Sequence, residues 1–304
     1  MTSIPATGPI VITPNVLAST LDNGLLSNQA SLASLEQQIA TGNAINTPSD
    51  NPAGASTMLQ LQANLQRANQ YSTNAQDGVG WLTLANSTVS SMISQMQSVI
   101  SLVQGVSGSA LTSQKATLTS TADQIQGSLQ ELINLGNTTY EGSQPIFAGT
   151  AAQAFSTNGT YVGAGNAPTR TVAPGTQVAV SVTGDQIFQS SAGNLIAPGG
   201  LLAGVVSDLK ANNAAGAEAQ LGNLQTALSQ METAAGSLGA QQQQMSGFSQ
   251  QATSSSTALQ QELGAVQSTN MAEAITSLQL QQTSYQEALY ATSQLSTDSL
   301  AKYL

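Results

Sequence analysis

The fold is decided by residues 61–103, which read LQANLQRANQYSTNAQDGVGWLTLANSTVSSMISQMQSVISLV. Apolar residues recur in this stretch at alternating intervals of three and four positions, and only Ser72 and Asn86 interrupt them. This spacing draws one apolar stripe along a helix, and over such a length it predicts a coiled coil rather than a compact helix. Asn51 followed by Pro52 marks the start of the helix, because asparagine caps helices and proline suits the first helical position.

Residues 221–266 repeat the same spacing, with polar gaps at Gln242, Ser249 and Ser256. Neither helical stretch can cover its own stripe, so we expect residues 51–139 and 201–269 to pack together as an antiparallel rod within one chain. Parallel self-association of the chain is the alternative. Trp81 lies beside the stripe and is interpreted as a packing residue, with an exposed interface anchor as the other possibility.

The middle of the chain, residues 140–200, has a different character. Short β-favouring runs alternate with turn signals, which predicts a small antiparallel β module inserted into the helical hairpin. The fold class is therefore mainly α, a long antiparallel coiled-coil rod formed by both chain ends with a small inserted β-rich domain. The runs are Ile146-Phe147, Tyr161-Val162, Thr169 to Val172, Val178 to Val182 and Ile187-Phe188, and the turn signals are Asn158-Gly159, Ala173-Pro174-Gly175 and Thr183-Gly184-Asp185.

The two terminal segments, residues 1–50 and 270–304, each carry a further apolar stripe. Gly42 is placed to cap the first helix, and Asn270 with Glu273 resembles a capping box that opens the last one. We expect these segments to be poorly folded in the monomer and to dock when neighbouring subunits cover them. Simple continuation of the coiled coil is the alternative. The expected assembly residues are Leu21, Leu25, Leu32, Leu35, Ile39, Ile275, Leu278, Tyr285, Leu289, Leu295 and Leu300, with Asn28 as one polar member of the first stripe.

The composition excludes much chemistry. The chain has His 0 and Cys 0, which removes the commonest general base and metal ligand and every thiolate site. A net charge of -10 argues against nucleic acid as a partner. No catalytic, cofactor or metal site is expected. Charged residues make up 7% of the chain, where about 25% is usual, and this favours close packing of many copies. A sticky, acid-tolerant secreted protein is the alternative.

The first 66 residues contain no Lys or Arg, so no cleavable secretory signal or membrane-spanning segment is expected there. Residues 1–15 are interpreted as an extended arm. These features indicate a cytoplasmic protein, or one exported by a route that does not use this type of signal.

Three stretches resemble the flagellin superfamily and, within it, the hook-associated protein 3 family of hook–filament junction proteins. The first is LASLEQQIATGNAINTPSDNPAG, residues 32–54, and the second is IFAGT, residues 146–150. The third is MAEAITSLQLQQTSYQEALYATSQL, residues 271–295, with the ending Tyr303-Leu304. Asn43 departs from the pattern, because the family often carries a basic residue after the glycine at Gly42.

This resemblance implies a bacterial, extracellular, non-enzymatic adaptor that joins hook to filament as a homo-oligomeric ring. Its neighbours would be a hook-side junction protein and a filament-side flagellin. Type III export with an uncleaved signal, and a cytoplasmic chaperone on the C-terminal helix, are also implied. One alternative is a minor flagellin that forms the filament itself. Another is an enzyme inserted in a flagellin-like frame, but a His-x-x-His zinc site cannot exist without histidine.

Overall fold

The computed structural model describes residues 14–106 and 115–301, and its internal contacts divide the chain into two units. Unit 1 comprises residues 1–65 and 257–304, and unit 2 comprises residues 66–256. Two long helices, α2 (Pro52–Val106) and α7 (Leu221–Gln267), contribute residues to both units. The three-part organisation expected from the sequence concerns roles in assembly and stays a prediction.

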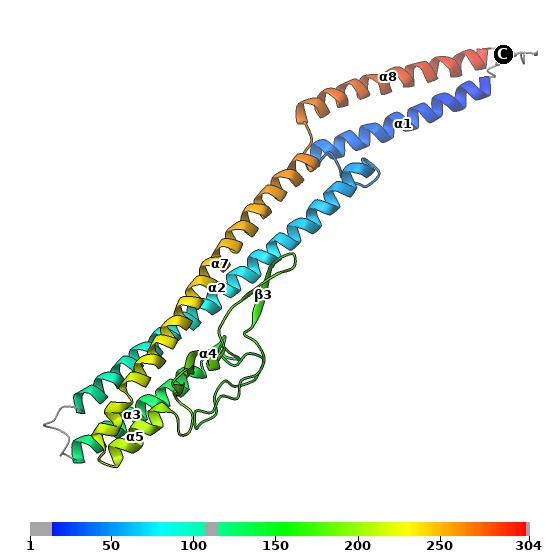
Figure 1. Cartoon of the computed structure of the whole chain (residues 1–304). Helices are drawn as coiled ribbons and strands as arrows, with labels where there is room; N and C mark the ends of the chain where they lie inside the picture. The colour runs from blue at the N-terminus through cyan, green and yellow to red at the C-terminus, as the bar shows by residue number, and fades with distance from the viewer. Residues whose placement is uncertain (1–13, 107–114, 302–304) are drawn as a thin grey trace, which may run out of the picture. The chain divides into compact units, whose positions relative to one another are not determined.

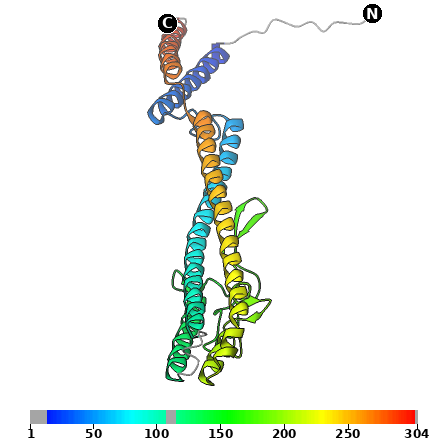
Figure 2. The same cartoon turned by 60° about the vertical axis from the view of Figure 1, so that its left-hand side comes forward.

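Within unit 2, α2 and α7 run side by side in opposite directions (Figures 1 and 2). Gln242 Nε2 donates a hydrogen bond to Thr83 Oγ1 at 3.0 Å, and Ser256 Oγ donates to Asn69 Oδ1 at 2.7 Å. The pairing of the two heptad stretches inside one chain is therefore confirmed. Helix α3 (Lys115–Gly136) packs against α5 (Leu201–Lys210), and the short α6 (Ala214–Ala219) follows.

The core of unit 2 is assembled from residues of α2, α3, α5, α6 and α7 and of the middle of the chain. Helix α2 contributes an unbroken row of methionine and aliphatic side chains, and Trp81, only 2% exposed, belongs to the same cluster. The interpretation of Trp81 as a packing residue is thus confirmed. Members that are fully buried include Leu82, Val89, Met92, Met96, Val103, Leu118, Ile125, Leu132, Leu202, Val205, Met231, Leu238 and Met245.

The middle of the chain contains three two-stranded antiparallel sheets. The predicted strand at Thr169 to Val172 is present, and Gly175 has a φ of +70° in the turn that follows it. The antiparallel module is confirmed, although its strands coincide only in part with the β-favouring runs: Val180 to Val182 lie outside the strands, and Tyr161 forms only an isolated bridge with Phe155. The pairs are β1 (Thr139–Tyr140) with β2 (Gln144–Pro145), β3 (Thr169–Ala173) with β4 (Thr176–Ala179), and β5 (Gln189–Ser190) with β6 (Gly193–Asn194).

Two β-favouring runs are wrong. Ile146-Phe147 lies in the turn that follows β2. Ile187-Phe188 forms the end of a short helix, α4 (Gly184–Phe188), rather than a strand. The expected turn at Thr183-Gly184-Asp185 is the start of this helix, where Thr183 and Gln186 form a capping box. Phe188 packs edge-on against Phe155, with ring centroids 5.1 Å apart, so the helix buries the same apolar residues that favoured a strand.

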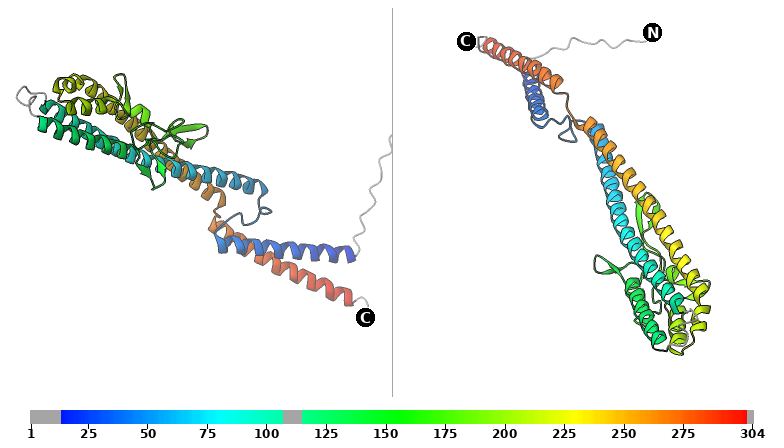
Figure 3. Two further views of the ribbon diagram at one scale, coloured as in Figure 1. Left: turned by 90° about the horizontal axis from the view of Figure 1, so that it is seen from below. Right: turned by 90° about the vertical axis from the view of Figure 1, so that its left-hand side faces the viewer.

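In unit 1, helices α1 (Pro14–Thr41) and α8 (Met271–Ala301) lie side by side (Figures 1 and 3). Gly42 follows α1 with a φ of +73°, and Asn51 Oδ1 accepts a hydrogen bond from the Gly54 amide at 2.9 Å at the start of α2. Both predicted helix boundaries are confirmed. The expected N-terminal arm falls mostly within residues 1–13, outside the described part of the chain. None of the helices in residues 14–106 and 115–301 combines the length and apolarity needed to cross a bilayer.

Candidate functional site

The predicted apolar row of α1 faces its partner helix in unit 1. Leu21, Leu25, Leu32, Leu35 and Ile39 are all half-buried, and α1 packs along α8. The single polar member of this row, Asn28, accepts a hydrogen bond from Gln281 Nε2 at 3.0 Å. A polar pair inside an apolar contact fixes the register of two helices, because any other alignment leaves one of its groups unpaired.

The less exposed face of α8 is made mostly of small and polar side chains. Ala274 is 5% exposed, and the half-buried positions that follow at helical spacing include Ser277, Gln281, Ser284 and Ala288. Gln281 is the residue that binds Asn28 of α1, so this face lies against α1. Large leucine side chains on α1 therefore pack onto small residues of α8, which allows the two helices to approach closely.

The predicted stripe of α8 lies at the margin of that contact and is partly open. Ile275 is 44% exposed and Leu289 is 43% exposed, whereas Leu278 and Tyr285 are half-buried. Met271, 42% exposed, extends the row by one turn and escaped the sequence prediction. These five residues, which we call the α8 stripe, recur at helical spacing along α8, and Gln281 and Gln282 occupy the turn between Leu278 and Tyr285. The side chains of Leu295 and Leu300 lie outside the described residues.

Other large apolar side chains of unit 1 are even more exposed, and the heptad analysis missed them. Leu280 and Tyr290 of α8 are 69% and 68% exposed, Leu26 of α1 is 63% exposed and Leu59 of α2 is 62% exposed. They occupy positions outside the three-four repeat. Apolar residues that lie off a coiled-coil repeat are the signal that could have identified them.

The loop between α1 and α2 is tied to the break between α7 and α8. The Ala44 amide donates to Gln267 O at 2.7 Å, and the Thr269 amide donates to Gly42 O at 3.0 Å. Ile45 of this loop is buried and touches Gly54 in the first turns of α2. These contacts within unit 1 anchor the adjoining ends of α1 and α8.

Asp50 organises the same loop. Its carboxylate accepts hydrogen bonds from the amides of Thr47 and Asn46 at 2.7 and 2.9 Å, and from the Thr47 hydroxyl at 2.9 Å. These bonds, the Thr47 amide first, favour the ionised carboxylate and hold the pKa of Asp50 below its ordinary value. The loop contacts are therefore complete only while Asp50 is ionised.

Unit 1 carries acidic charge alone over a long range of sequence. Residues 1–65 and 257–301 contain no Lys, Arg or His, and Lys302 is the first basic residue after Lys210. When two copies meet through these ranges, neither copy offers a basic side chain that could form an ion pair with a carboxylate of the other. The acidic residues are Asp22, Glu36, Asp50, Glu262, Glu273, Glu287 and Asp298.

Comparisons with known proteins bear on both ends of the chain. Residues 12–152 match the family model for the bacterial flagellin N-terminal helical region, and residues 221–304 match that for the bacterial flagellin C-terminal helical region. Flagellar hook-associated protein 3 of Escherichia coli (strain K12) is 30% identical over 178 residues, which is 57% of this chain and 55% of that protein. The protein of the same name from Salmonella typhimurium is 29% identical over the same length. The chain thus spans about half the length of these curated relatives.

Solved structures share the fold. A protein of Vibrio parahaemolyticus described as a flagellar hook-associated protein superposes with a TM-score of 0.64 at 17% identity, covering 72% of this chain and 100% of that one. FlgL of Xanthomonas campestris superposes with a TM-score of 0.59 at 15% identity, covering 67% of this chain and 99% of that one. Among sequence relatives, a flagellin also matches: phase 1 flagellin of Salmonella naestved is 30% identical over 130 residues, which is 42% of this chain and 25% of that protein.

Proposed function

Because the chain belongs to the flagellin family, we propose that it is a structural adaptor that joins hook to filament in the bacterial flagellum. The observation that carries the proposal is the partly open α8 stripe on a helix pair with little buried core of its own. The names of the relatives favour the junction over the filament, since matches to hook-associated protein 3 extend over 57% of the chain and the match to phase 1 flagellin over 42%.

The proposed mechanism is physical rather than catalytic. The α1 and α8 helices are marginal when a single copy is alone, because one pair of exposed helices buries little apolar surface. In a ring of copies, neighbouring subunits cover the α8 stripe and gain about 25 cal/mol for each Å² of apolar surface removed from water. Faces of α2 and α7 supply lateral contacts, and the β module projects from them.

The further partners are those of a junction component. A hook-side junction protein and a filament-side flagellin adjoin the ring, and a cytoplasmic chaperone covers the C-terminal helix before export. The protein leaves the cell without a cleaved signal peptide and acts outside it. The flagellin-type termini support these assignments.

The experiment compares two acidic substitutions on α8 in the source bacterium. Leu289→Asp places a charge in the α8 stripe, and Ala291→Asp places the same charge on an exposed position two residues further along. Because a buried carboxylate without a partner is costly, we expect Leu289→Asp to abolish incorporation into flagella while Ala291→Asp supports it. Immunoelectron microscopy of flagella and secretion into the medium measure the outcome.

Normal filament growth on hooks that carry Leu289→Asp would contradict docking through the stripe. Deletion of the gene separates the two functions, because loss of a junction protein leaves bare hooks and releases flagellin into the medium. Long filaments formed by the purified chain alone would instead favour the minor flagellin, for which the shorter match to phase 1 flagellin is the supporting observation.

A further inference from the structure

The hairpin β3–β4 in unit 2 has a buried and an exposed face. Arg170 pairs with Val178 across the two strands, and alternation places Val172 and Val180 on the same side as these residues. The three valines are at most 4% exposed, whereas Thr169 and Gln177 on the other side are exposed. Arg170 is therefore the one charged residue on the buried face of the hairpin.

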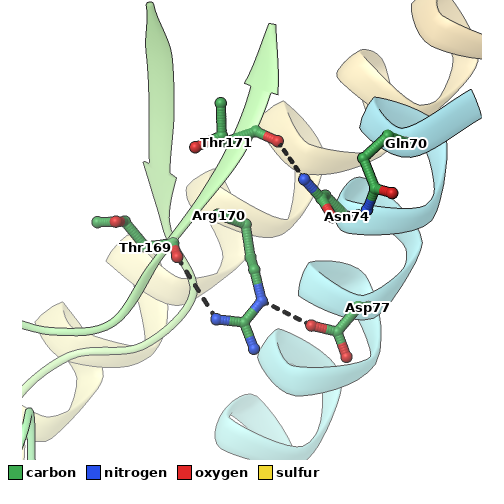
Figure 4. A network of polar contacts seen from close by, with 6 residues as sticks. All are labelled: Gln70, Asn74, Asp77, Thr169, Arg170 and Thr171. Carbon is green, nitrogen blue, oxygen red and sulfur yellow. Dashed lines mark hydrogen bonds and ion pairs between the residues drawn. The ribbon is translucent and has the colours of Figure 1, made fainter. Parts of the chain in front are cut away.

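This arginine binds the middle of α2. Arg170 Nε donates to Asp77 Oδ2 at 2.6 Å (Figure 4). Its guanidinium lies 5.3 Å from the centre of the Trp81 ring. Three residues before Asp77, Asn74 Nδ2 donates to the carbonyl oxygen of Thr171 at 2.8 Å. The hairpin is thus held along two turns of α2 by charge-assisted and polar contacts over an apolar base.

Small residues let the neighbours approach α2 at this level. A Cβ on Gly78 would lie 2.6 Å from Met245 Cε of α7, and one on Gly80 would lie 2.8 Å from the Tyr140 hydroxyl oxygen. Tyr140 stacks at a tilt on Trp81, with ring centroids 4.9 Å apart. Hairpin, α2 and α7 therefore meet in one closely packed layer.

Toward the N-terminal end of α2, before Ala75, the contact between α2 and α7 changes from apolar to mainly polar. Ala75 and Met245 are members of the continuous apolar core. Beyond them the helices meet through polar contacts, Ser72 with Thr253 at 3.3 Å and Asn69 with Ser256 at 2.7 Å, and the buried apolar residues there are the small Ala68 and Ala252. We call residues 66–72 and 249–256 the polar seam. Hydroxyl contacts of this kind exchange with water at small net cost, and they provide few dispersion contacts.

We propose that the β3–β4 hairpin is a brace that fixes where the α2–α7 pair of unit 2 can deform. The polar seam yields, because sliding or opening there exchanges weak hydrogen bonds with water. The braced level, residues 74–81, does not yield, because movement there must separate Arg170 from Asp77 and Trp81 and expose the hairpin valines. Arg170 is the positioning residue of this device.

Hydrogen exchange of the full chain, read by mass spectrometry, tests the proposal. In the wild type we expect amides of the polar seam to exchange about tenfold faster than those of residues 82–96. Arg170→Ala should raise exchange over residues 74–81 about tenfold, which is the scale of one lost charge-assisted contact. It should also red-shift the emission of Trp81, the only tryptophan of the chain, as water reaches the ring.

Lys210→Ala is the matched control, because it removes the other ion pair found among the described residues, Lys210 with Asp123 at 3.5 Å. It should leave exchange over residues 74–81 and the Trp81 emission unchanged. Equal exchange in the polar seam and in residues 82–96 would overturn the proposal, as would an Arg170→Ala chain with unchanged exchange over residues 74–81.

If Arg170→Ala also accelerates exchange throughout α3, the substitution unfolds unit 2 as a whole. The milder variant Arg170→Lys then distinguishes loss of the brace from general unfolding. Lysine keeps the charge but lacks the planar group that lies on Trp81 and meets Asp77. Faster exchange confined to residues 74–81 in that variant supports the brace, and unchanged or uniformly faster exchange overturns it.

Discussion

The two units differ in what their helices bury. In unit 2 the continuous apolar core runs from Ala75 to Met245 and includes Trp81, which packs against Tyr140. Among the described residues of unit 1, only Ile45, Ala55 and Ala274 are fully buried apolar residues. The same three-four repeat therefore yields a self-sufficient fold in one unit and an unfinished one in the other. A helix pair gains a core only when further elements cover its second face.

The sharpest way to break this contrast is to remove matched leucines from the two units. Leu82 is fully buried, so Leu82→Ala should destabilise unit 2 by about 2–5 kcal/mol through lost burial and a cavity. Leu32 of α1 is half-buried, and Leu32→Ala should cost about 1 kcal/mol in the monomer. Urea unfolding followed by Trp81 fluorescence and by helical circular dichroism measures both. Equal losses from the two substitutions would show that unit 1 has a core of comparable strength.

The two units are expected to lose stability at opposite ends of the pH range. Burial raises the pKa of Tyr140 and of Tyr161 in unit 2, so the stability they confer is present below pH 10 and lost as pH rises above it. The lowered pKa of Asp50 acts in the opposite sense, and the loop contacts of unit 1 are lost as pH falls below 3.8. Trp81 emission in urea at alkaline pH and amide shifts of Asn46 and Thr47 in acid report the two events.

Tyr140→Phe is the control for the alkaline limb, because it removes a group that titrates in unit 2 and should flatten the loss of stability above pH 10. A wild-type chain whose Trp81 transition is independent of alkaline pH would contradict the assignment for unit 2. Amide shifts of Asn46 and Thr47 that stay unchanged at every pH below 3.8 would contradict it for unit 1.

The smallest expected effect is a stabilisation of α1 in unit 1 by a single glycine substitution. Gly24 lies inside α1 with no atom near the position of an added Cβ, so Gly24→Ala should stabilise the helix by about 0.5–1 kcal/mol. Gly236→Ala in α7 has the same open surroundings and serves as the control in unit 2. Amide exchange in α1 should slow only with the first substitution. No change in α1 would mean that its stability is already set by tertiary contacts.

Much of the helical frame could be predicted because its signals are local. Asn51-Pro52, Gly42 and the three-four repeat act within a turn or two of the residues they organise, and the structure has helices that begin and end there. The prediction of a strand at Ile187-Phe188 was wrong because a two-residue apolar run is too short to show a periodicity. The capping box at Thr183 starts a helix there instead.

The candidate site was less accessible from sequence, because an apolar stripe does not say what it packs against. The row from Leu21 to Ile39 of α1 lies in the helix contact, but α8 presents Ala274 and Ser277 to it and leaves Ile275 and Leu289 partly open. The large-on-small packing depends on both helices at once, so neither stripe alone could reveal it.

The scarcity of basic residues in unit 1 also determines how the protein can be followed in the laboratory. The only lysines before residue 302 are Lys115 and Lys210, so amine-reactive dyes label side chains of unit 2 and spare those of the α1–α8 pair through residue 301. Trypsin likewise has no cleavage site between Lys210 and Lys302, and it releases α7 and α8 as one peptide. A dye-labelled chain therefore carries its side-chain labels at Lys115, Lys210 and Lys302, and none within α1 or α8.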